Sequence, residues 1–160
     1  MITVSFLKSL TMIFTRGSRR NYPMLDRNKI LSKMNFIRQS KRKLEELKQV
    51  ERHDFLNNFT CFDSSKYNFI VLIEAMIDIC NHIISRQGFE IPDSSADSIK
   101  ILVKNNILSE EYQATFVAMV KFRNRIVHLY HDVDNEEVYE ILQKNLDDVD
   151  NFLVDIINYI

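Results

Sequence analysis

Apolar side chains recur at steps of three and four residues along most of the chain, which is the spacing of one face of an α-helix. The first such stretch runs from Asp26 to about Arg52, and aspartate is a favoured N-cap residue, so we expect a helix to begin at Asp26. Its apolar positions are Leu25, Ile30, Met34, Ile37, Leu44 and Leu47. Later stretches with helical spacing predict further helices at about 66–86, 95–104, 109–127 and 134–160.

The predicted helix over 66–86 is apolar almost all round, which is typical of a helix at the centre of a bundle or in a subunit interface. Its polar residues form one thin stripe, Glu74, Asp78, Asn81 and His82. Because a buried polar group without a partner costs a few kcal/mol, we expect each member of the stripe to contact another element.

Turn and cap residues mark the ends of the helices. Residues 57–65 are polar and aromatic and end in an Asp-Ser-Ser run, which predicts a connection followed by a cap. Gly88 and Pro92 mark a loop over 87–95. The last helix opens with Asp134-Asn135-Glu136-Glu137, the pattern of a capping box. With only two glycines and two prolines in the chain, the sequence predicts an all-α bundle of four long helices plus a short helix, and excludes a sandwich or barrel.

Residues 1–23 differ from the rest, because they carry four basic residues and no acidic one. Met24-Leu25-Asp26 then resembles a fresh start of a folded domain. We therefore expect 1–23 to be an N-terminal extension outside the native domain, and 24–160 to be one domain. The apolar run in 1–23 is too short to span a bilayer, and we expect no membrane association.

The composition is that of an ordinary globular protein, with 46% apolar and 27% charged residues. Cys61 and Cys80 lie in apolar runs without a metal-binding spacing, so we expect reduced core thiols in a cytoplasmic protein. The net charge is −1, and residues 132–160 contain nine acidic residues and one basic residue. RNA binding would therefore need a local basic patch, for which the candidates are Lys41, Arg42, Lys43, Lys121, Arg123 and Arg125. The alternative for 41–43 is an ordinary solvated helix face.

The stretch from Phe122 to Tyr130 contains the pattern Arg-x-x-x-x-His-x-Tyr. Arginine fits two phosphate oxygens with its fork of donors, and histidine transfers protons near neutral pH. Together, Arg123 and His128 are sufficient for metal-free cleavage of RNA, in which the 2′-OH of the substrate is the nucleophile. The spacing presents a difficulty, because on a regular helix Arg123 and His128 point roughly 140° apart. Both can reach one phosphate only if the helix ends between them or if a second copy of the chain contributes.

A competing arrangement is a metal site formed by His128, His131, Asp132 and Asp134. The spacing lacks an i,i+4 pair of ligands on a helix, so we expect no metal and no other cofactor.

The run from Met119 to Tyr130, followed by Asp132-Val133-Asp134 and by Val138 to Leu142, resembles the HepT-like members of the HEPN superfamily. The pattern Glu74-Ala75-x-x-Asp78-x-x-Asn81-His82, followed by Gly88 and Pro92, resembles the second helix and loop of the same family. The resemblance covers 24–160. This chain departs from the family at Lys121, where a small residue is common, and at Leu129, where an acidic residue is common.

The resemblance implies a HEPN-like bundle that forms a homodimer with its motifs facing a shared cleft. It implies a metal-independent endoribonuclease that is the toxin of a toxin–antitoxin pair. The antitoxin would be an MntA-type minimal nucleotidyltransferase, which silences the toxin by adding AMP to the motif tyrosine, here Tyr130. An assembly of toxin and antitoxin larger than the dimer stays open.

The predicted site follows from the motif and the resemblance together. Arg123 and His128 are the predicted catalytic residues, with Asn124 orienting His128 or the phosphate. Asp78 and Asn81 are candidates for structural or catalytic support, and Lys121 and Arg125 for RNA binding. Two alternatives stay open: a non-catalytic HEPN module that binds nucleotides or serves a nucleotidyltransferase as an adaptor, and a helical interaction protein without an anion site.

Overall fold

The structure is a computed structural model that describes residues 24–129 and 132–160. The described residues form helices and no strand, so the predicted all-α class is confirmed. The elements are α1 (Arg27–Lys48), α2 (Arg52–Asn57), α3 (Phe59–Gln87), α4 (Ser95–Lys104), the 3-10 helix η1 (Glu110–Tyr112), α5 (Gln113–His128), α6 (Asn135–Lys144) and α7 (Asp148–Tyr159).

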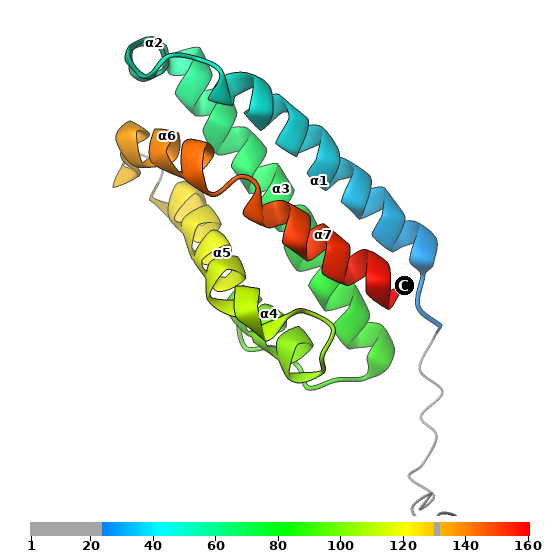
Figure 1. Cartoon of the computed structure of the whole chain (residues 1–160). Helices are drawn as coiled ribbons and strands as arrows, with labels where there is room; N and C mark the ends of the chain where they lie inside the picture. The colour runs from blue at the N-terminus through cyan, green and yellow to red at the C-terminus, as the bar shows by residue number, and fades with distance from the viewer. Residues whose placement is uncertain (1–23, 130–131) are drawn as a thin grey trace, which may run out of the picture.

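The long helices run side by side around α3 (Figure 1). α1 lies along one side of α3 and α5 along the other, while α6 and α7 cross the bundle on the face toward the viewer. Aromatic rings join these layers, because Phe69 of α3 stacks edge-on against Phe122 of α5 with centroids 5.5 Å apart. Phe116 of α5 contacts Phe152 of α7 in the same way at 5.6 Å.

The central position predicted for 66–86 is confirmed, since most side chains of this part of α3 are buried in the core. α3 also has the length and hydropathy that a membrane span would need, but a core helix meets the same criterion and 67% of its most apolar window is buried here. Cys80 is a buried free thiol and Cys61 is half-buried and free, as expected for core cysteines.

Several predicted helix ends are confirmed by their caps. The carboxylate of Asp26 accepts a hydrogen bond from the backbone N–H of Lys29 at 3.0 Å, which caps α1. Ser94 caps α4 through the N–H of Asp97 at 3.2 Å. Gly88 ends α3 in the left-handed conformation with φ 67°, which glycine adopts without strain.

The predicted connection over 57–65 was wrong, because α3 already begins at Phe59 and a short helix, α2, precedes it. Asn58 supplies the cap by accepting from the N–H of Thr60 at 3.0 Å. Ser65 lies inside the helix, and its hydroxyl donates to the carbonyl of Cys61 at 2.8 Å. A serine that bonds back to the preceding turn does not end a helix, so the Asp-Ser-Ser run was not a cap.

The predicted single helix over 134–160 is divided into α6 and α7 by a turn at 145–147. Leu146 stays buried inside this turn, so the apolar pattern continues across the break without a glycine or proline to mark it. The described part of the chain therefore has more helices than the four long ones and one short one that the pattern predicted.

The polar stripe of α3 finds its partners on different elements, as expected. Glu74 pairs with Arg123 of α5. Asp78 pairs with Lys33 of α1 at 2.6 Å, and Asn81 accepts from the hydroxyl of Ser98 on α4 at 2.7 Å. These contacts fix α1, α4 and α5 around the one strip of α3 that the core does not cover.

His82, the last member of the stripe, holds the start of the folded domain. Its Nε2 accepts the backbone N–H of Asp26 at 3.2 Å, which makes this nitrogen the unprotonated one. Burial lowers the pKa of His82, the positive charges of Lys29 and Arg86 lower it further, and Asp26 acts in the opposite direction. Protonation of Nε2 would remove the acceptor for Asp26.

The stability of the protein is therefore predicted to depend on pH through His82. Because the pKa of His82 is lowered in the folded state, the unfolded state takes up the proton first as the pH falls. The stabilisation is complete above about pH 6.5 and is lost as the pH falls through the folded pKa, by at most about 1.4 kcal/mol per pH unit. Denaturant unfolding of the wild type and of His82→Gln, which keeps an acceptor but does not titrate, measures this. A difference between the two proteins that is constant from neutral to acidic pH would contradict it.

Candidate functional site

The predicted motif lies at the C-terminal end of α5, and the helix is unbroken between Arg123 and His128. His128 is the last helical residue, and the backbone N–H of Leu129 still donates to the carbonyl of Arg125 at 2.7 Å. The first of the two conditions, that the helix ends between the arginine and the histidine, is therefore wrong. At about 100° per residue the two side chains leave the helix roughly 140° apart.

Arg123 faces α3 and is already engaged. Its Nη2 forms an ion pair with Glu74, and its Nη1 donates to the side-chain oxygen of Asn124 at 2.8 Å. Only 18% of the Arg123 side chain is exposed, and its Nε is buried without a hydrogen-bond partner. The predicted phosphate-binding group is thus paired with a carboxylate and held against the bundle.

His128 lies on a different face of α5 and is exposed. Lys121 and Asn124 precede it by seven and four residues, so the three side chains share one face of the helix. Lys121 is also exposed and has no ion-pair partner in the part of the chain that the structure describes. The predicted proton-transfer group therefore shares its surface with one free cation and with the amide that contacts Arg123.

Arg125, the other predicted RNA-binding residue, is paired with a carboxylate. Its two terminal nitrogens each donate to Glu137 of α6 at 2.7 Å. These hydrogen bonds and the carboxylate charge raise the pKa of Arg125 above its ordinary value. The carboxylate of Glu137 thus binds Arg125 and not the backbone N–H of Asp134, which a capping box would require. Asp134 caps α6 alone, by accepting from the N–H of Glu136 at 3.0 Å.

Among the described residues, neither Asp78 nor Asn81 forms a hydrogen bond or ion pair with Arg123, Asn124 or His128. Their partners are Lys33 and Ser98, so both hold the bundle together here. The stripe residue that does reach the motif is Glu74, which was not among the predicted site residues. Its position one helical turn before Asp78 was the only sequence signal for such a contact.

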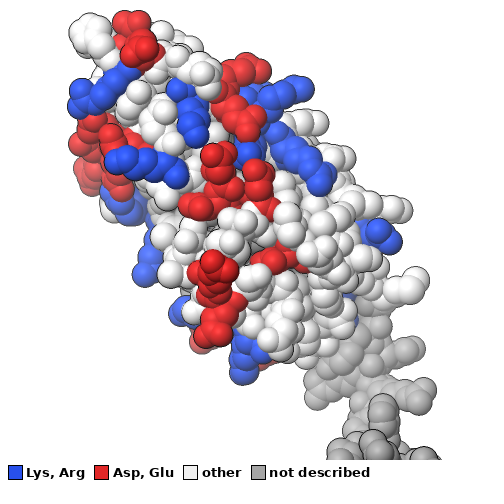
Figure 2. Space-filling model, viewed as in Figure 1, with Lys and Arg blue, Asp and Glu red and all other residues white. Residues whose placement is uncertain are grey.

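The basic run on α1 is partly neutralised by the acidic C-terminal region. Lys41 forms ion pairs with Glu45 at 3.0 Å and with Asp150 at 2.9 Å. Burial by itself lowers the pKa of Lys41, but the hydrogen bonds that Lys41 donates to Asp150 and Glu45 raise it overall. Figure 2 shows acidic side chains gathered over the junction of α6 and α7, with basic side chains beside them. Lys41 therefore holds the bundle, whereas Arg42 and Lys43 are exposed.

Tyr130 and His131 lie outside the described residues, so the predicted modification site and one member of the competing metal arrangement have no structural description. Within 24–129 and 132–160, no group of three or more His, Cys, Asp or Glu side chains could hold a metal ion.

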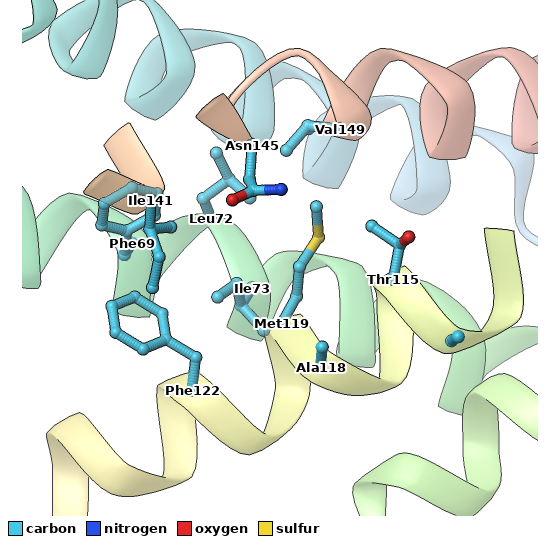
Figure 3. A pocket seen from close by; sticks show the side chains of 11 residues that line it. Phe69, Leu72, Ile73, Thr115, Ala118, Met119, Phe122, Ile141, Asn145 and Val149 are labelled. Carbon is cyan, nitrogen blue, oxygen red and sulfur yellow. The ribbon is translucent and has the colours of Figure 1, made fainter. Parts of the chain in front are cut away.

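A cavity of about 370 Å³ lies between α3, α5 and the α6–α7 junction (Figure 3). Its lining is apolar apart from Thr115 and Asn145. Neither Arg123 nor His128 lines it, and an apolar wall cannot compensate the charge of a phosphate. The chemistry that the side chains can support therefore lies at the motif and not in this cavity. The lining residues are Phe69, Leu72, Ile73, Ala114, Thr115, Ala118, Met119, Phe122, Ile141, Asn145 and Val149.

Exposed apolar side chains lie on the helix faces that carry Glu74 and Arg123, and another lies on α1. Tyr67, 63% exposed, lies two turns before Glu74 on the same face of α3, and Val127, 43% exposed, lies one turn after Arg123. Phe36 is 48% exposed, and its ring lies 5.9 Å from the Nζ of Lys33, the partner of Asp78. We refer to Phe36, Tyr67 and Val127 as the apolar rim.

Comparison with known proteins identifies relatives of this arrangement. A model of the family described as Ribonuclease HepT-like matches residues 37–156, which include α3 and the whole motif. The chain is 35% identical over 122 residues to the mRNA nuclease HepT of Shewanella oneidensis, covering 75% of this chain and 92% of that protein. The resemblance that the sequence motifs indicated is confirmed.

Solved structures agree with the family match. A chain from a crystal structure of a toxin–antitoxin complex with AMP-PNP has a TM-score of 0.76 and 30% identity, over 83% of this chain and 99% of the other. A chain from the tri-AMPylated Shewanella oneidensis HEPN toxin in complex with its MNT antitoxin has a TM-score of 0.75 and 31% identity, over 86% of this chain and 100% of the other.

Proposed function

The chain belongs to the ribonuclease HepT-like family, and we propose that it is the toxin of a toxin–antitoxin pair, an endoribonuclease that an MNT-type nucleotidyltransferase silences. The observation that carries this proposal is an arginine and an exposed histidine at the end of α5 in a chain 35% identical to an mRNA nuclease. A toxin of this kind would act in the cytoplasm, where its RNA substrate is.

The proposed reaction uses groups of the protein and the substrate only. One His128 takes the proton of the ribose 2′-OH, and the 2′-oxygen attacks the adjacent phosphorus. The bond from phosphorus to the 5′-oxygen breaks, and a second imidazole donates a proton to that oxygen. The products are a 2′,3′-cyclic phosphate and a free 5′-OH. Arg123 stabilises the negative charge that grows on the phosphate oxygens, which is commonly the largest single contribution in such sites.

A second copy of the chain would allow an arginine and a histidine to reach the same phosphate, which one copy of α5 does not allow. Because Arg123 and His128 leave an unbroken helix on different faces, we propose that the arginine of one protomer and the histidine of the other act on one phosphate. A two-fold axis near the apolar rim would bury Phe36, Tyr67 and Val127 and bring the two motifs together. Two histidines in the shared cleft also provide separate groups for the base and the acid.

Silencing is proposed to act through Tyr130, two residues after His128. Addition of AMP to its hydroxyl brings a bulky, negatively charged group next to the histidine. Since the substrate is an anion, the modified site would repel it. In this reaction, carried out by a nucleotidyltransferase, the tyrosine oxygen gives up its proton and attacks the α-phosphorus of ATP, and pyrophosphate leaves.

The proposed mechanism predicts cleavage that needs His128 and no metal. His128→Ala should reduce cleavage of single-stranded RNA by roughly 10² to 10⁴-fold, the usual contribution of a general acid or base. RNA binding, measured by fluorescence anisotropy, should be retained. The wild type should be equally active with and without EDTA, and its products should carry cyclic phosphate ends. Activity that EDTA abolishes and Mg²⁺ restores would contradict the mechanism, and nucleotide binding without any cleavage would support the adaptor alternative.

The shared site predicts complementation between two inactive variants. Arg123→Ala and His128→Ala should each be inactive alone, whereas mixed dimers contain one intact arginine–histidine pair. Co-refolding should recover activity well above that of either variant but below about a quarter of the wild-type activity, because half of randomly mixed dimers are mixed, each keeps one of its two pairs, and each lacks the second histidine that shares the acid and base roles. No recovery, despite mixed dimers detected by native mass spectrometry, would indicate that each chain uses its own arginine and histidine.

The proposed silencing predicts a specific effect of Tyr130→Phe. Incubation with the nucleotidyltransferase and ATP should add AMP to the wild type, seen as a mass increase, and stop its RNA cleavage. Tyr130→Phe should gain no mass, and whatever cleavage it supports should persist after the same incubation. Tyr112→Phe is the matched control, because it removes the same hydroxyl from a tyrosine of η1 that belongs neither to the motif nor to the apolar rim, and this variant should still be modified. Modification of Tyr130→Phe at another tyrosine would contradict the assignment.

A further inference from the structure

We infer that Glu74 competes with the RNA phosphate for Arg123, so that the free protein withholds the charge of its own phosphate-binding group. This inference rests on the proposed ribonuclease function and adds a positioning residue to it. Glu74 would not touch the reacting atoms, and it would act through the guanidinium that does.

The contacts of Arg123 support this role. Both terminal nitrogens are engaged, Nη2 by the carboxylate of Glu74 and Nη1 by Asn124 at 2.8 Å. The side chain of Glu74 is 38% exposed and that of Arg123 only 18%, so the carboxylate is the partner nearer to solvent. An incoming phosphate would meet Glu74 at the same guanidinium.

Carboxylate and phosphate are recognised by arginine in the same way, through parallel N–H donors. The two anions therefore compete for the same donors. An ion pair of a guanidinium and a carboxylate has no net charge, so the pair contributes little long-range attraction for RNA. As the 2′-oxygen attacks, negative charge grows on the phosphate oxygens, and the exchange from Glu74 to phosphate becomes more favourable.

The neighbouring ion pairs make this exchange important. Arg125 is paired with Glu137, and Lys33 is paired with Asp78. Among Lys33, Lys121, Arg123 and Arg125, Lys121 alone has no ion-pair partner in the described part of the chain. The release of Arg123 from Glu74 would thus be a large part of the positive charge that RNA can gain at this site.

The test measures RNA binding in the cleavage-deficient His128→Ala background, with a fluorescent single-stranded RNA over a series of salt concentrations. Glu74→Gln keeps an oxygen that can accept from Arg123 but removes the charge. It should bind RNA roughly three- to tenfold more tightly at low salt. The slope of log K against log salt should change by less than about 0.7, the value for one phosphate contact on a single strand, because Arg123 contacts a phosphate in both complexes. Replacement of a residue with a merely structural role would leave the affinity unchanged or weaken it, and would not tighten binding.

Glu90→Gln in the same background is the matched control. It makes the same chemical change and the same change in net charge, but Glu90 pairs with Lys104 at 2.9 Å beyond the end of α3. It should change the affinity much less than Glu74→Gln. Equal effects of the two variants, or weaker RNA binding by a folded Glu74→Gln protein, would overturn the competition.

A crystal structure of the His128→Ala protein with a short RNA tests the same inference without altering Glu74. The expected result is Arg123 on a phosphate and detached from Glu74. Arg123 still paired with Glu74 while RNA is bound would overturn it. RNA binding without a Glu74 effect contradicts the competition alone. An inactive wild type together with no RNA binding by any variant contradicts the proposed function, and the competition with it.

Discussion

The burial of α3 is the constraint on which the rest of the structure depends. A helix surrounded by α1, α4, α5 and α6 can tolerate polar groups only where each has a partner. Asp78, Asn81 and His82 meet this requirement with contacts to α1, to α4 and to the segment before α1. Glu74 meets it with Arg123, so the same requirement that organises the bundle also decides where the arginine of the motif lies.

The regular geometry of α5 is the second constraint, and it links the fold to the proposed chemistry. An α-helix that continues to His128 directs Arg123 toward α3 and His128 toward solvent. One chain therefore has the two groups that phosphodiester cleavage needs, but on different surfaces. The apolar rim includes Val127, one turn after Arg123 on α5. Burial of exposed aromatic and aliphatic side chains is the usual driving force for association. A second copy of the chain would therefore serve both purposes. It would bring an arginine and a histidine to one phosphate, and it would cover the apolar rim.

Local signals explain most of what the sequence could predict. Asp26 and Ser94 cap the starts of α1 and α4 through side chains that accept from the first turn, so the sequence alone was sufficient to predict where these helices begin. The start of α3 and the turn at 145–147 could not be predicted, because Ser65 bonds backward inside the helix and Leu146 keeps the apolar pattern intact. In the site, Arg123 and His128 suggested RNA cleavage, but only together with the wider family resemblance, because their spacing alone is not specific. The pairs Arg123–Glu74 and Arg125–Glu137 depend on how helices pack, and no spacing along the chain encodes them.

An acidic protein that cleaves RNA must solve an electrostatic problem, since its net charge of −1 gives no general attraction for the substrate. Three anions would meet at Arg123 under the functions proposed here: the resident carboxylate, the substrate phosphate, and the AMP attached two residues after His128. The guanidinium can satisfy only a limited number of acceptors at once. A site in which its charge is already neutralised binds weakly to arbitrary anions and responds to the group whose charge increases during the reaction. The same balance makes the site sensitive to a single added negative group, which is a physical reason why one modification can suffice to silence a ribonuclease of this kind.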